Sequence, residues 1–157
     1  WVHVLAFVTL IASILLFGLT LQRINVSYSE NVSNTTRPNH VSVLPFKQIQ
    51  SLDDLSRELN QRDNKMIMLD FYADWCVTCK EMELLTFSNE KVKAALSTYQ
   101  LIQVDVTKNT VEHQRILKQY ALFGPPAILF FDANGDEKIA RRVIGFMKAE
   151  RFLERLQ

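Results

Sequence analysis

The stretch that decides the fold is residues 66–80, MIMLDFYADWCVTCK. Its first part, Met66–Tyr72, is a nearly continuous apolar run, which is typical of a central strand buried on both faces. The chain then passes through a short turn into Cys76-Val77-Thr78-Cys79 and a helical stretch that we expect to continue through Phe87. A C-x-x-C pair that ends a buried strand and opens a helix is a signature of redox-active thiols.

The two cysteines are expected to play different roles. Cys76 would sit at the helix N-terminus, where unpaired N–H groups and the helix dipole favour a thiolate. Cys79 lies one turn inside, close enough to form a disulfide with it. We therefore expect Cys76 to attack an external disulfide and Cys79 to resolve the mixed disulfide.

The alternatives for the two cysteines are two incidental buried thiols or half of a zinc site. Zinc would need two more ligands, and the chain offers three histidines, none paired with another ligand: His3, His40 and His113.

Asp70 interrupts the apolar strand. A carboxylate in such a position is costly unless it is functional or well paired. Because it precedes Cys76 by six residues on a strand that runs into the helix, we expect it beneath the active site. Burial would raise its pKa and make it a candidate proton acceptor and donor for Cys79. The alternative is an ordinary Asp at the surface edge of the sheet.

A pair of prolines precedes another apolar run. Pro125-Pro126 stands directly before Ala127–Phe131, AILFF, which reads as a second buried strand. We expect a cis bond before Pro126 that turns the chain toward the active site. The alternative is two trans prolines that end a loop.

From Leu44 onward the chain has the pattern of an alternating α/β domain. Ser51 and Thr110 are expected to cap helices, and Asn134-Gly135 is a strong hairpin signal. The helices are expected over residues 52–61, 76–87, 89–96, 111–120 and 148–156, and the strands over 66–72, 101–106, 127–131 and the return from the hairpin through 138–144. The order β-α-β-α-β-α-β-β-α, without internal repeat, predicts a three-layer α/β sandwich.

Composition excludes several other classes of protein. The 157 residues suit one ordinary domain with an appendage. Eighteen Lys and Arg against 17 Asp and Glu give a net charge of +1, which provides no basic footprint for nucleic acid. We therefore expect no nucleic-acid partner. Two cysteines are too few for a disulfide-rich miniprotein.

The N-terminal region differs from the rest of the chain. Its first 21 residues, WVHVLAFVTLIASILLFGLTL, contain no Asp, Glu, Lys or Arg, and as a helix they would span roughly 30 Å. We expect a transmembrane helix over residues 1–22, a polar linker over 23–45 and a folded domain over 46–157. A signal peptide would have a basic start and a cleavage site, and a buried core helix is the third alternative. The missing initial Met suggests a fragment of a longer protein.

The expected linker contains three N-x-S/T triplets, at Asn25, Asn31 and Asn34. In a eukaryotic secretory protein these would be glycan acceptors. In a tether rich in Asn, Ser and Thr they also arise by chance, and we favour that interpretation.

The combined motifs resemble a known family. W-C-x-x-C-K after a strand, an Asp six residues upstream and a later Pro before a strand are the thioredoxin-fold pattern, a central mixed β-sheet flanked by helices. The chain is more narrowly similar to the C-terminal periplasmic domain of the DsbD family of thiol:disulfide interchange proteins. That resemblance covers residues 46–157 and rests on four strings: LDFYADWCVTCKEMELLTF, QVDVT, GPPAILFFDANG and RVIGFM. The apolar start is similar to the last membrane helix before that domain.

The resemblance implies a protein-disulfide reductase anchored in the bacterial inner membrane, with the thioredoxin-like domain in the periplasm. Two electrons would arrive from a membrane redox domain of the same parent protein and leave to a periplasmic domain that carries a disulfide. No cofactor beyond a redox-active Cys76–Cys79 disulfide is implied.

The resemblance also implies roles for individual residues. Cys76 matches the exposed nucleophile and Cys79 the resolving cysteine. Asp70 and Glu83 match two acidic residues that tune the thiols, and we expect both to stay anionic at neutral pH. The substrate-contacting residues would be Trp75, Pro125 and the cis-proline, Pro126.

Two departures from the family pattern concern partner recognition. Pro125 replaces the usual aliphatic residue before the cis-proline, and Ala127 replaces the common Thr after it. Both belong to the loop expected to face the substrate, so they put the choice of partner in doubt and leave the redox chemistry intact.

Two other functions fit the same residues. One is a singly anchored thioredoxin-like protein of cytochrome c maturation or of the eukaryotic secretory pathway. The other is a non-catalytic thioredoxin-fold binding module, against which the intact C-x-x-C argues.

Overall fold

Strand β2 (Ile67–Tyr72) lies at the centre of the domain, and all six of its residues are buried. It belongs to a five-stranded sheet with the order β1-β3-β2-β4-β5. Strands β1 (Lys47–Ile49) and β3 (Gln100–Asp105) form the parallel half with β2. Strands β4 (Ala127–Phe131) and β5 (Val143–Ile144) complete the sheet in antiparallel pairing. These features come from a computed structural model that describes Trp1 and residues 44–61 and 64–157.

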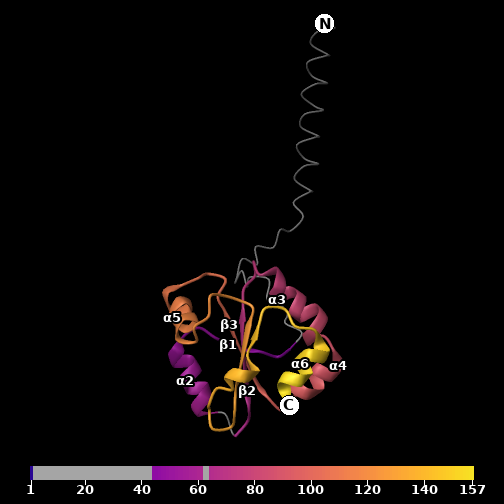
Figure 1. Ribbon diagram of the computed structural model, residues 1–157. Coiled ribbons are helices and arrows are strands. Elements are labelled where there is room, and N and C mark those ends of the chain that lie inside the picture. The colour runs from indigo at the N-terminus through magenta and orange to yellow at the C-terminus, as the bar shows by residue number, and fades with distance from the viewer. Residues whose placement is uncertain (2–43, 62–63) are drawn as a thin grey trace. The chain divides into compact units, whose positions relative to one another are not determined.

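Helices cover both faces of this sheet (Figure 1). Helices α2 (Leu52–Asn60) and α5 (Val111–Gln119) pack on one face. The other face carries α3 (Val77–Met82), η1 (Glu83–Phe87), α4 (Glu90–Leu96) and α6 (Ala149–Leu156). The three layers and the order of elements confirm the predicted α/β sandwich and thioredoxin fold.

Alternation along β2 distributes its side chains between two apolar cores. Leu69 and Phe71 belong to the core beneath α2 and α5, whereas Met68 belongs to the core beneath α3, α4 and α6. Successive side chains of a strand point to opposite faces, so Asp70 projects to the same side as Met68. Asp70, the one carboxylate of β2, therefore faces the layer that contains α3, the cysteine helix, which Cys76 caps.

Side-chain caps determine where several helices begin. Ser51 Oγ accepts the Asp54 N–H at 3.1 Å, and Thr110 Oγ1 accepts the His113 N–H at 3.2 Å. Asn89 caps α4 in the same way. Each bond satisfies a backbone donor that the first helical turn leaves without a partner. The predicted starts of these helices are confirmed to within one residue.

The predicted helix over residues 76–87 is not α-helical throughout. It continues as α-helix only to Met82, and residues Glu83–Phe87 form a π-helical turn, η1. This turn buries Thr86 and Phe87 and leaves Leu84 and Leu85 exposed. Hydrophobic spacing cannot separate the two helix types, because both place residues three to five positions apart on one face.

The hairpin return is also shorter than predicted. Asn134-Gly135 does form the turn, with Gly135 at φ +85°, but β5 contains only Val143–Ile144. Residues Ile139–Arg141 form a 3₁₀ turn, η2, instead of strand. The segment KIARR lacks an alternating apolar set that could be buried against the sheet, and Ile139 itself is exposed.

The predicted transmembrane helix over residues 1–22 lies outside the described residues, as does almost all of the predicted linker. Within the described ranges, no helix is both long and apolar enough to cross a bilayer.

Truncation of Phe152 to Ala is expected to lower the free energy of unfolding by about 3–5 kcal/mol. Its fully buried ring packs edge-on against Phe87 and is tilted against Phe130, with centroids 5.7 and 6.1 Å away. Phe123 is fully exposed, so Phe123→Ala is the matched control and should cost less than about 0.5 kcal/mol. Urea unfolding measures both values, and similar losses in the two variants would contradict the packing of α6 on the sheet.

Candidate active site

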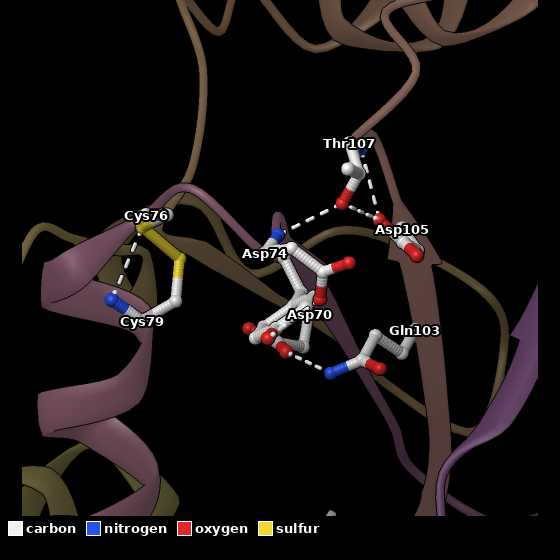
Figure 2. Close-up of a disulfide and its surroundings, with 8 residues drawn as sticks. Asp70, Asp74, Cys76, Cys79, Gln103, Asp105 and Thr107 are labelled. Carbon is white, nitrogen blue, oxygen red and sulfur yellow. Dashed lines mark hydrogen bonds between the residues drawn. A yellow bond between two sulfur atoms is a disulfide. The ribbon is translucent and has the colours of Figure 1, made fainter. Parts of the chain in front are cut away.

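The two cysteines form a disulfide at the start of α3 (Figure 2). Their Cα atoms lie 5.3 Å apart. Cys76 is the N-cap residue, and its sulfur accepts the Cys79 N–H at 3.1 Å. The same N–H and the helix dipole would stabilise negative charge on Cys76 after reduction, because they direct positive partial charge at its sulfur.

Both cysteines are nearly covered in this oxidised form. Cys76 is 6% exposed and Cys79 is 4% exposed. The expectation of an exposed Cys76 is therefore wrong for the disulfide state. The flanking side chains Trp75 and Val77 are largely exposed. A partner would meet these two apolar side chains next to a disulfide with little exposed surface.

Asp70 lies in the middle of the sheet, which excludes the alternative of an Asp at a surface edge. It is 5% exposed, and its Oδ2 accepts a 2.7 Å hydrogen bond from Gln103 Nε2 (Figure 2). Gln103 Oε1 in turn accepts a 2.7 Å bond from Gln48 Nε2. The three residues are register partners on adjacent strands. They form a polar row across the sheet that ends at the carboxylate.

The protonation of Asp70 differs from the expectation for neutral pH. Burial raises the pKa of its carboxyl to about 7, the charge of buried Glu83 adds to the rise, and the bond from Gln103 opposes it. Both its protonated and its ionised forms are therefore accessible near neutral pH. The prediction that burial raises its pKa is confirmed, whereas the prediction that Asp70 stays anionic at neutral pH does not agree with this value. The energetic reason is that a charge in an apolar interior loses its hydration.

Thr107 fixes the turn before Cys76. Its hydroxyl accepts the Asp74 N–H at 2.8 Å and donates to the Asp105 carboxylate (Figure 2). Its carbonyl accepts the Trp75 Nε1–H at 3.3 Å. A single residue after β3 therefore holds both the backbone of the turn and the indole that projects beside the disulfide.

The proline pair lies at the same end of the sheet as the cysteines. Phe71 on β2 is paired with Ala127 on β4, and Ala127 with Ile144 on β5. Because these strands alternate in direction, the residues after β2, before β4 and after β5 lie together at one end of the sheet. The Pro125-Pro126 bond is cis, so the prediction is confirmed and the trans alternative is wrong.

Sequence reasoning missed some residues of the site. Gln103 had a signal, since it interrupts the apolar run LIQVDV just as Asp70 interrupts its strand. Thr107 had none, because its role depends on the turn that packs against it. Among the described residues, no three His, Cys, Asp or Glu side chains are grouped to hold a metal ion.

The comparisons with known proteins agree with this geometry. Residues 53–157 match the model of the thioredoxin-like domain family. The thiol:disulfide interchange protein DsbD of Yersinia enterocolitica is 49% identical over 122 residues, which cover 78% of this chain and 21% of that protein. The chain thus spans about a fifth of the length of the curated relatives it matches.

Solved structures add a second line of similarity. The oxidised C-terminal domain of Neisseria meningitidis DsbD is 36% identical, with a TM-score of 0.58, and the match covers 69% of this chain and 95% of that one. Fasciola hepatica thioredoxin shares the fold at 21% identity, with a TM-score of 0.55 and coverage of 71% and 96%. With its disulfide at the start of α3 over a buried carboxylate, the chain belongs to the thioredoxin-like domain family and, within it, to the C-terminal domains of DsbD thiol:disulfide interchange proteins.

Proposed function

We propose that this chain is a protein-disulfide reductase that passes two electrons between protein partners through Cys76 and Cys79. The observation that carries the proposal is the disulfide at the N-terminus of α3, with the buried Asp70 among its surroundings (Figure 2). Because the chain belongs with the C-terminal domains of DsbD proteins, we expect the electrons to flow toward the partner, which is reduced.

The exchange proceeds in two displacement steps from the reduced chain. The Cys76 thiolate attacks one sulfur of the partner disulfide, the partner S–S bond breaks, and the released sulfur takes up a proton. Cys79 then gives its proton to Asp70 and attacks the Cys76 sulfur, which frees the second partner thiolate. Asp70 passes that proton to the second partner thiolate, and the first released sulfur takes its proton from solvent. The partner thereby gains two electrons and two protons, and the chain is left with the Cys76–Cys79 disulfide. A donor dithiol restores the reduced chain by the reverse steps.

Asp70 suits the role of proton acceptor for Cys79. Its pKa of about 7 lies below the ordinary thiol value of roughly 8.5, so its ionised form is present near neutral pH to take the thiol proton. This pKa is also close enough to neutral pH for protonated Asp70 to return the proton in the reverse reaction. The buried Glu83 contributes by raising the pKa of Asp70 through its charge.

The partners and the location belong to the same proposal. The electron donor would be a membrane redox domain of the same parent protein, and the acceptor a periplasmic domain with a disulfide. The named relatives are about five times longer than the matched stretch, which leaves room for such domains. A transmembrane helix over residues 1–22 would attach the domain to the inner membrane, and the uncharged apolar run there supports it.

Replacement of Cys79 by Ser is expected to trap a mixed disulfide, because Cys76 can still attack but nothing resolves the product. Cys76→Ser is the matched control and should trap none. The test incubates each reduced variant with insulin and separates the products on non-reducing gels. Trapping through Cys79 instead would reverse the assignment, and failure of the unmodified chain to reduce insulin would favour a non-catalytic binding module.

Replacement of Asp70 by Asn is expected to stabilise the oxidised domain at high pH and to change little at low pH. In the folded chain the carboxyl keeps its proton up to about pH 7, whereas in the unfolded chain it loses it near 3.8. The folded state therefore binds the extra proton between these values, and the stability of the parent falls as pH rises through this window. The gap between the folded and unfolded pKa values of Asp70 corresponds to a loss of at most about 4 kcal/mol in the stability of the parent above pH 7.

Urea unfolding of the oxidised proteins at about pH 4 and pH 8 measures this effect. Asp53→Asn, at an exposed position on α2, is the control. A gain from Asp70→Asn that is the same at both pH values would contradict the raised pKa of Asp70.

Replacement of Pro125 by Ile is expected to increase the turnover of insulin several-fold. In thioredoxin-like folds the residue before the cis-proline commonly pairs its backbone with an extended partner chain. Pro125 has no N–H, so it cannot donate to that chain, and one hydrogen bond is worth about 0.5–1.5 kcal/mol. The comparison requires equal reduction potential and stability in the two proteins. Equal or lower turnover of the variant would mean that the missing donor does not limit recognition.

A further inference from the structure

The segment Gly145–Met147 follows β5 and lies at the end of the sheet where the disulfide is also found. Ile144 is paired with Ala127, which is paired with Phe71 near the end of β2. The Gly145 N–H donates to the Pro126 carbonyl at 3.0 Å, so the segment is joined to the proline loop. Phe146, between the two ends of the segment, is 38% exposed. A protein that presents a disulfide to Cys76 would meet this end of the sheet.

The cysteine helix holds the far end of this segment through both backbone groups of one residue. The Met147 N–H donates to Met82 Sδ at 3.2 Å, and the Met147 carbonyl accepts from Thr86 Oγ1 at 2.5 Å. Met82 and Thr86 are fully buried. Met82 is the last residue of α3, three positions after Cys79, and Thr86 lies in the π-helical turn η1.

These two contacts are more specific than apolar packing requires. Leu at position 82 and Val at position 86 would fill nearly the same space without any polar atom, and each would suit a buried helix face. Instead, a hydroxyl and a thioether satisfy the donor and the acceptor of Met147, groups that are costly to leave without partners inside a protein. The contacts also begin at a π-helical turn, a distortion that is frequent at functional sites.

We propose that Thr86 and Met82 are positioning residues that set the place of the Gly145–Met147 segment relative to Cys76. The inference rests on the proposed function, because it concerns how the same site receives a protein disulfide. Met82 ends the helix that Cys76 caps, and Thr86 lies in the π-helical turn that continues it, so their bonds to Met147 fix Phe146 in relation to the attacking sulfur. They act on the affinity for a folded or extended protein partner and leave the reactivity of the thiols themselves unchanged.

Thr86→Val removes the hydroxyl at nearly constant volume, and Thr86→Ser is the matched control that keeps it. Each chain is assayed with dithiothreitol as donor over a range of insulin concentrations. Separately, the pre-reduced chain, freed of dithiothreitol, is mixed in a single turnover with dithiodipyridine, a disulfide too small to reach the Gly145–Met147 segment. Thr86→Val should raise KM for insulin about threefold to tenfold at unchanged kcat. Its rate with dithiodipyridine should stay within twofold of the parent, and Thr86→Ser should restore KM.

Met82→Leu provides an independent readout that does not depend on turnover. Loss of the sulfur acceptor should speed hydrogen exchange of the Met147 amide at least fivefold, while the Phe130 amide in β4 keeps its protection. It should also raise KM for insulin in the same direction as Thr86→Val. This variant keeps the test valid even if Thr86→Val folds poorly.

Four results would overturn the inference. They are an unchanged KM for insulin in Thr86→Val, an equal fall of the insulin and dithiodipyridine rates, a Thr86→Ser variant as impaired as Thr86→Val, and unchanged exchange of the Met147 amide in Met82→Leu. A parent chain that reduces dithiodipyridine but never insulin would overturn the proposed function, and the inference with it. A working parent with unaffected variants would overturn the inference alone.

Discussion

Burial of β2 between β3 and β4 is the constraint on which the rest of the site depends. Because β2 is central, its parallel neighbour contributes Gln103 and its antiparallel neighbour brings Pro125 and Pro126 to the end where the cysteines lie. The same burial places Asp70 in an apolar interior that disfavours its charge. The strand that holds the domain together is therefore also the one that prepares the carboxylate for proton transfer.

The cost of Asp70 is reduced by its neighbours but not removed. Gln103 donates to its carboxylate, and Gln48 orients Gln103 from the next strand, yet the buried Glu83 acts in the opposite direction. A fully paired carboxylate would stay ionised and could not return a proton, whereas an unpaired one would stay protonated and could not accept one. The arrangement lies between these limits, which is what exchange of a thiol proton near neutral pH requires.

The parts of the molecule that sequence reasoning predicted are those with local causes. The apolar run of β2, the helix start at Cys76, the caps Ser51 and Thr110 and the cis bond at Pro126 each depend on a few neighbouring residues. The missed features depend on tertiary contacts instead. The π-helical turn η1, the short strand β5 and the role of Thr107 become visible only once distant segments pack together.

The residues that carry out the chemistry and those that meet a partner occupy different parts of the end of the sheet where the disulfide lies. The thiols, Asp70 and Glu83 are buried, so their reactivity is set by the interior and is protected from solvent. Trp75, Val77 and Phe146 are exposed, and each belongs to a segment that a hydrogen bond or the cysteine helix holds in place. A covered disulfide with a fixed apolar surround disfavours chance exchange with small thiols, because an attacking sulfur must reach a site with little exposed surface. Selectivity then follows from shape at the surface, and the interior can keep the same redox residues whichever partner docks.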